Sequence, residues 1–138
     1  MNSPLRLGID VQRVSDLPVL AVTGEIDIYT APLFKQAVVN LVSEGNDAVV
    51  IDLTGVTFMD SSGFGTLLGA TRRLRPAGGG LFLAGPNNTI QRMLRLTRLD
   101  SIMQIYPTVQ EAVDALKAGG ARTSAPVASG TPDEMRAA

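Results

Sequence analysis

The residues of this chain whose types and spacing best suit chemistry are an aspartate followed by two serines, Asp60, Ser61 and Ser62. An apolar, strand-like segment precedes them and a helical pattern follows. One hydroxyl should therefore cap backbone N–H groups at the helix start, while the other faces solvent within reach of a kinase. The alternative is that both serines merely begin the helix, where serine is a common residue.

Glycines follow the serines at unusual density, at Gly63, Gly65 and Gly69. Each glycine inside a helix costs about 1 kcal/mol relative to alanine, so we expect a close backbone approach to require them. Gly65 and Gly69 are four residues apart and therefore share one helix face. That face is either pressed against a sheet or left open for a partner, and the sequence favours neither.

The same segment does not match the common catalytic motifs. Its third glycine comes one place late for a dinucleotide-binding loop, and no acidic residue follows at the required distance. Neither serine has the flanking glycines of a nucleophile elbow. The chain contains no histidine and no cysteine, which removes Ser-His-Asp triads, thiol nucleophiles and Cys/His zinc sites. We therefore expect no enzyme, no metal and no cofactor.

Four acidic residues lie at or near the ends of predicted strands: Glu25, Asp27, Asp52 and Asp60. Carboxylates that converge can bind a metal or hydrolyse glycosidic bonds, but nothing in the sequence indicates that these converge. For Glu25 and Asp27 the simpler interpretation is that they cap loop N–H groups before the first helix. Asp60 has the stronger functional case because it precedes Ser61.

Composition narrows the possible partners and compartment. The 138 residues include 45% hydrophobic residues, which suits one compact domain. Twelve basic and thirteen acidic side chains give a net charge of -1, without a basic stretch for nucleic acid or an anionic membrane. No signal sequence begins the chain and no apolar run approaches the roughly 18 residues of a membrane span. We expect a cytoplasmic protein.

Apolar periodicity predicts five strands and four helices. The strands fall at residues 5–12, 19–22, 48–53, 81–83 and 102–106. The helices begin after the N-caps Thr30, Asn88 and Thr108 and after Ser62, and the apolar, buried stripe of the first helix includes Leu33. A turn at Ser15 and Asp16 joins the first two strands in a hairpin, and residues 23–27 form the connection to the first helix. This order predicts an α/β sandwich with a mixed, mainly parallel sheet and an antiparallel edge strand. Residues 1–117 form the domain, and residues 118–138, with almost nothing to bury, a disordered tail.

Two segments carry a resemblance to a known family. Residues 24–27 (Gly-Glu-Ile-Asp) and residues 58–65 (Phe-Met-Asp-Ser-Ser-Gly-Phe-Gly) resemble the bacterial anti-sigma factor antagonists, which are free-standing STAS domains. The resemblance spans about residues 5 to 117. In that family the serine directly after the aspartate is phosphorylated by a partner serine kinase that doubles as the anti-sigma factor. The resemblance therefore implies Ser61 as the acceptor in preference to Ser62.

The resemblance also implies a function. The unphosphorylated form would bind the anti-sigma factor and release a sigma factor, phosphorylation of Ser61 would block binding, and a separate serine phosphatase would reset the switch. The implied partner-binding residues are Glu25, Asp27, Asp60, Ser61, Ser62, Gly63 and Gly65. STAS domains also serve in transporters, lipid-transport complexes and signalling scaffolds. A constitutive scaffold subunit without a phosphoswitch is therefore the alternative.

Overall fold

The computed structural model describes residues 6–118, which form a five-stranded sheet with the strand order β1-β2-β3-β4-β5. The strands are β1 (Leu7–Val14), β2 (Leu17–Ile26), β3 (Ala48–Met59), β4 (Gly80–Ala84) and β5 (Gln104–Tyr106). The helices are α1 (Ala31–Ser43), α2 (Ser61–Leu74), α3 (Asn88–Leu96) and α4 (Val109–Lys117), with short 3-10 helices at Arg75–Ala77 and Leu99–Ser101. Only β1 and β2 pair antiparallel, so the predicted mixed sheet with an antiparallel edge strand is confirmed. The predicted disordered tail lies almost wholly outside the described residues.

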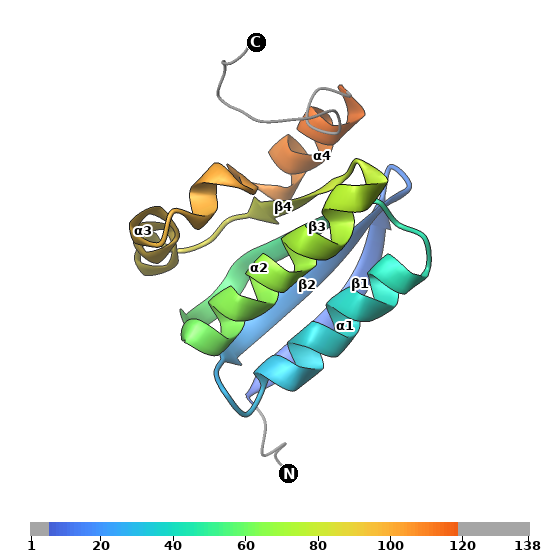
Figure 1. Cartoon of the computed structure of the whole chain (residues 1–138). Helices are drawn as coiled ribbons and strands as arrows, with labels where there is room; N and C mark the ends of the chain where they lie inside the picture. Colours follow the sequence, from blue (N-terminus) through green and yellow to red (C-terminus); the bar gives the residue numbers. More distant parts are fainter. Residues whose placement is uncertain (1–5, 119–138) are drawn as a thin grey trace.

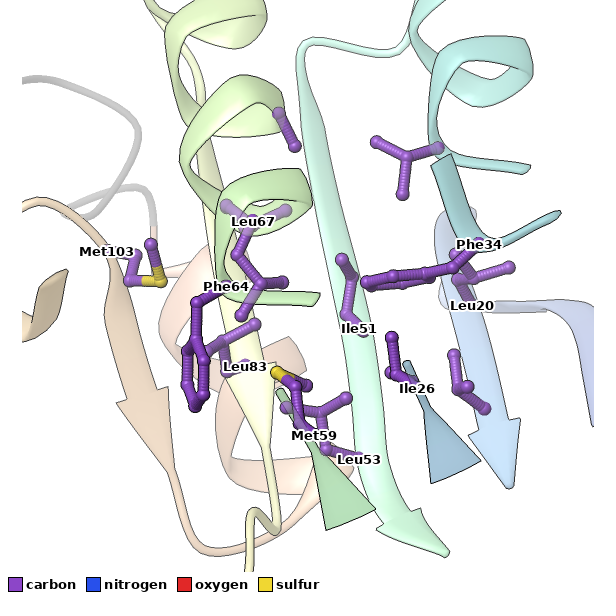
Figure 2. Close-up of a cluster of buried hydrophobic side chains, with 14 of the residues drawn as sticks. Leu20, Ile26, Phe34, Ile51, Leu53, Met59, Phe64, Leu67, Leu83 and Met103 are labelled. Atoms are coloured by element: carbon purple, nitrogen blue, oxygen red, sulfur yellow. The ribbon is translucent and has the colours of Figure 1, made fainter. Parts of the chain in front are cut away.

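The helices cover the two faces of the sheet unequally. α1 and α2 lie side by side on one face, while α4 packs on the other (Figure 1). On the α1–α2 face, Phe34 and Leu67 are fully buried and point toward Ile51 and the neighbouring strands (Figure 2). α3 adds Ile90 and Leu94 to this larger cluster. The near-continuous apolar run of β3 reflects burial on both faces, as expected for a central parallel strand.

The first two strands form the predicted hairpin, with Ser15 and Asp16 as a two-residue turn between the paired Val14 and Leu17. Both turn residues have positive φ, 52° and 67°, as a primed hairpin turn requires. The predicted connection at residues 23–27 was wrong for most of its length. Residues 23–26 continue β2, because β3 runs on to Met59 and pairs with it as far as Ile26.

Two other boundaries differ from the sequence-based prediction. Asn87, not Asn88, is the N-cap of α3, and its Oδ1 accepts a hydrogen bond from the Ile90 N–H at 2.9 Å. The fifth strand starts at Gln104 instead of residue 102, because the chain first turns through a 3-10 helix. Thr108 caps α4 as predicted, accepting from the Glu111 N–H. Within residues 6–118 no helix is both long and apolar enough to cross a bilayer.

Candidate functional site

The parallel pairing of β2 and β3 brings the two sequence motifs together at one edge of the sheet. Ile26, the last residue of β2, lies opposite Met59, the last residue of β3. The next residue, Asp60, donates its backbone N–H to the Ile26 carbonyl oxygen at 3.0 Å. Residues 24–27 and 58–63, far apart in the sequence, therefore form one continuous surface.

Asp60 is the N-cap of α2. Its backbone is extended (φ -101°, ψ -170°), and its Oδ1 accepts a hydrogen bond from the Ser62 N–H at 2.8 Å. Its carbonyl oxygen accepts from the Gly63 and Phe64 N–H groups at 3.0 and 3.3 Å. The prediction that a serine hydroxyl caps this helix was wrong, because the carboxylate one residue earlier already occupies the capping position. Aspartate caps a helix as well as serine does, and its charge is favourable at that end of the dipole.

The two serines have different surroundings. Ser61 is exposed, and its hydroxyl forms no hydrogen bond within residues 6–118. Ser62 is half-buried, and its carbonyl oxygen accepts a hydrogen bond from the Thr66 hydroxyl at 3.1 Å. With the cap supplied by Asp60, the Ser61 hydroxyl is free to meet another molecule.

The glycines of α2 serve two different purposes. A Cβ on Gly63 would collide with the Met59 side chain and lie 2.9 Å from Cγ2 of Ile26, so this glycine allows α2 to pack closely on the ends of β2 and β3. At Gly65 and Gly69, by contrast, an added Cβ would have no atom within 4 Å. Of the two interpretations left open by the sequence, the second holds: the shared face of Gly65 and Gly69 is open and is not pressed against the sheet.

That open face forms one wall of a groove of about 240 Å³ between α1 and α2. Its α2 side consists of Ser62, Gly65, Thr66, Gly69, Ala70 and Arg73, and its α1 side of Lys35, Val38 and Val39. The floor is apolar, and a cation from each helix borders it. Because the groove includes Ser62, it is continuous with the exposed start of α2.

Asp27 organises the β2–α1 loop. Its Oδ1 accepts hydrogen bonds from the N–H groups of Tyr29 and Thr30 at 2.9 and 3.0 Å, the Asx-type turn expected from the sequence. The Thr30 N–H is the main cause that lowers the pKa of this carboxyl, since it stabilises the charged form. The Thr30 hydroxyl donates to the Glu25 carbonyl oxygen at 2.8 Å, which holds the loop against the end of β2. Thr30 begins α1 as predicted, but its hydroxyl does not cap that helix.

Glu25 does not cap loop N–H groups, contrary to the simpler interpretation. Its carboxylate instead pairs with the Arg6 guanidinium at 2.9 Å across the β1–β2 edge. Asp52 is also occupied locally, because its Oδ1 accepts from the Thr54 N–H and hydroxyl at 3.0 and 2.6 Å. The four strand-end acids therefore have separate local roles. In the part of the chain that the structure describes, no group of three or more acidic residues is placed to hold a metal ion.

Exposed apolar side chains occur in the two segments that meet at the start of α2, the β2–α1 loop and the end of β3, and the sequence patterns did not predict them. Ile28 and Tyr29, in the loop after Asp27, are 66% and 78% exposed, and Phe58 is 49% exposed. Leu33, assigned to the buried stripe of the first helix, is 45% exposed instead. A sign of this exposure is present in the sequence. The two large apolar residues of this loop lie between a turn-forming aspartate and a helix, outside the apolar stripes of the predicted strands and helices. Exposed apolar side chains gathered in neighbouring segments are typical of a protein-binding surface.

Comparison with known proteins identifies the class to which this fold and site belong. The STAS domain family matches residues 8–112. The chain therefore belongs to the STAS domain family.

The relatives narrow this further. The chain is 39% identical over 103 residues to the anti-sigma-B factor antagonist of Listeria monocytogenes, and this match covers 73% of this chain and 90% of that protein. It is 31% identical to an anti-sigma factor antagonist from Mycobacterium paratuberculosis of known crystal structure, with a TM-score of 0.77 over 85% of this chain and 99% of that one. Unphosphorylated SpoIIAA, at 22% identity and a TM-score of 0.65, shares the fold; the match covers 80% of this chain and 98% of that one.

Proposed function

We propose that this chain is an anti-sigma factor antagonist whose binding is switched by phosphorylation of Ser61. In the unphosphorylated state it binds an anti-sigma factor that is also a serine kinase, and thereby frees a sigma factor. Phosphorylation by that kinase ends the interaction, and a serine phosphatase restores it. The names of its relatives support the first part, since they are anti-sigma factor antagonists.

One observation carries the proposal for Ser61: its hydroxyl is exposed and unbonded among the described residues, at the start of a helix whose adjoining segments carry exposed apolar side chains. Tyr29 in the β2–α1 loop and Phe58 near the end of β3 are exposed apolar side chains that a partner would bury. Aromatic residues are enriched at protein interfaces, and tyrosine and tryptophan are among the residues that carry most of the binding energy. We expect a partner that binds across the ends of β2 and β3 to contact Ser61 as well, because the Asp60 N–H is bonded to the end of β2.

A phosphate on Ser61 would leave the domain folded. Phosphorylation adds about 1.5 to 2 negative charges. Ser61 is the first residue of α2, where the positive end of the helix dipole favours an anion. The added charge therefore acts on the partner and not on the fold.

The size of the effect can be estimated from electrostatics. Two like unit charges about 4 Å apart repel by roughly 4 kcal/mol at an effective dielectric near 20. Each 1.4 kcal/mol corresponds to about tenfold in affinity. A phosphoserine that meets a carboxylate of the partner, with Asp60 adding its own charge beside it, would thus weaken binding at least a hundredfold.

The test is the affinity of Ser61 variants for the cognate anti-sigma factor, measured by calorimetry. Ser61→Ala should bind as tightly as the wild type, and Ser61→Asp should bind at least about tenfold more weakly, equivalent to 1.4 kcal/mol. Ser43→Ala, an exposed serine at the other end of α1, is the matched control and should retain wild-type affinity. Equal affinities of Ser61→Ala and Ser61→Asp would refute the switch.

The alternative, a constitutive scaffold subunit, makes a different prediction about the protein in its own cells. Intact mass of the purified chain should include a species heavier by one phosphate, and fragmentation should place that phosphate on Ser61. A chain that carries no phosphate under any growth condition would favour the scaffold.

A further inference from the structure

The outer surface of α3 differs in character from the surface around Ser61. We define the α3 patch as the side chains of Arg92, Met93, Arg95, Leu96 and Arg98, all of which are exposed. Two of these side chains are apolar and three are guanidinium groups. The helix needs none of them for packing, because its buried face consists of Ile90 and Leu94.

The apolar part of the α3 patch is open to solvent. Leu96 is 71% exposed and Met93 is 38% exposed. They are three residues apart and therefore adjacent on one side of the helix. Exposed single leucines are common on protein surfaces, so this pair acquires meaning only together with the charges beside it.

The three guanidinium groups have no partner in the fold. None of them forms an ion pair or a side-chain hydrogen bond within residues 6–118. Arg6, which precedes β1, does have such a partner in the described residues, because its guanidinium group pairs with the Glu25 carboxylate. Arg95 lies in the last turn of α3, where a cation is favourable, but this does not account for Arg92 one turn earlier or for Arg98 beyond the helix end.

Arg98 supplies the second observation. Its φ is +65°, the left-handed conformation that follows many helix ends and that glycine adopts without strain. A side chain there costs roughly 1 kcal/mol or more. The backbone would thus be more stable with glycine, and the arginine contributes nothing to packing that offsets the difference. The guanidinium group, and not the backbone, is therefore the part of this residue available for binding another molecule.

We propose that the α3 patch is a docking surface for an acidic segment of a partner protein that carries an apolar anchor. Arginine and methionine are enriched at protein interfaces, and the planar guanidinium group binds carboxylates through two parallel hydrogen bonds. Leu96 and Met93 would receive the apolar anchor while the arginines neutralise the flanking carboxylates. A lipid surface fits less well, because recognition of anionic membranes uses clusters of about four to eight basic residues.

This proposal stands on α3 alone and does not require any modification of Ser61. The probe for its test is a short fluorescein-labelled peptide with glutamates around leucines at helical spacing, and its matched control is the same peptide with glutamine for glutamate. Anisotropy titrations of the full chain should show saturable binding of the acidic peptide and much weaker binding of the neutral one. Amide shifts in nitrogen-15 spectra should centre on residues 89–98.

Variants separate the α3 patch from general surface charge. The double variant Arg92→Gln/Arg95→Gln should weaken probe binding about tenfold or more, and Leu96→Gln should also weaken it. Arg72→Gln/Arg75→Gln removes two exposed arginines from the end of α2 and serves as the control, with affinity unchanged. Arg98→Gly should raise the melting temperature and yet weaken binding, a combination that a purely structural role would not give.

Several outcomes would overturn the proposal. These are no saturable binding of the acidic peptide, equal binding of the neutral peptide, or an equal loss in the α2 control. Vesicles that contain phosphatidylserine provide the remaining arm. If they bind the chain more tightly than the peptide does, and the α3 variants abolish this, the α3 patch recognises lipid instead of protein.

Discussion

Asp60 explains why the neighbouring Ser61 hydroxyl forms no hydrogen bond among the described residues. Its carboxylate caps α2 through the Ser62 N–H, and its own N–H is bonded to the end of β2. The Ser61 hydroxyl therefore makes no contact that stabilises the helix, and a group attached to it would not remove the N-cap of α2. Sequence alone could identify the motif but not this division of labour, because aspartate and serine are equally good caps and only their actual geometry decides between them.

Replacement of the cap should reduce stability without a change in the fold. Asp60→Ala should lower the free energy of unfolding by about 1 kcal/mol, the usual cost of an N-cap loss. Urea unfolding, with an unchanged m-value, is the measurement. Ser61→Ala is the control and should unfold at the wild-type midpoint. If Ser61→Ala were the more destabilising variant, the cap would belong to the serine.

At the scale of the element, α2 combines a packed side and an open side. Gly63 is required by its contact with Met59 and Ile26, whereas Gly65 and Gly69 have space around them. A sequence pattern cannot separate these cases, since all three residues weaken the isolated helix equally. What separates them is the distance from each Cα to the sheet, which only the tertiary structure determines.

Alanine at these glycines should change stability in opposite directions. Gly65→Ala and Gly69→Ala should each stabilise the fold by about 0.5 to 1 kcal/mol, through better helix propensity and a less flexible unfolded chain. Gly63→Ala should destabilise it by about 1 to 3 kcal/mol, the usual cost of overpacking. Thermal and urea unfolding of the three variants would check this.

The affinities of the same variants carry separate information. If a partner approaches the open side of α2, Gly65→Ala should bind the anti-sigma factor more weakly even though it is more stable. A stabilised variant with undiminished affinity would place the interface elsewhere. A destabilised Gly65→Ala would contradict the observed free space at that position.

The architecture of the whole molecule was accessible from the sequence because strands and helices alternate strictly after the first hairpin. The β-branched run at residues 48–53 predicted a central strand, and alternation at residues 5–12 predicted an edge strand. The length of the pairing between β2 and β3 was harder to predict from the sequence. Residues 23–26 carry glycine and polar residues, and they became strand because β3 is long enough to pair with them. Exposure of Ile28 and Tyr29 likewise depends on where the loop lies.

Residues 6–118 should account for the stability of the whole chain. Among the described residues, both apolar clusters lie between β1 and the end of α4. Residues 119–138 contain only Val127 and Met135 among the larger apolar residue types. A chain truncated after residue 118 should therefore melt within about 1 °C of the full-length chain, since few apolar side chains are lost. Calorimetry of the two proteins is the check, and circular dichroism should show the same helix content. A drop of several degrees would mean that the C-terminal residues contribute to the domain.

The double attachment of Asp60, to the end of β2 and to the first turn of α2, also constrains how any kinase can recognise Ser61. The Asp60 carbonyl oxygen holds the N–H groups of Gly63 and Phe64, so the chain could be drawn out as an extended peptide only by unwinding that turn. A kinase that acts on this serine would therefore have to recognise a conformational epitope composed of two strand ends, a loop and a helix. A linear peptide with the same residues would lack that epitope, and the specificity of signalling would reside in the tertiary fold.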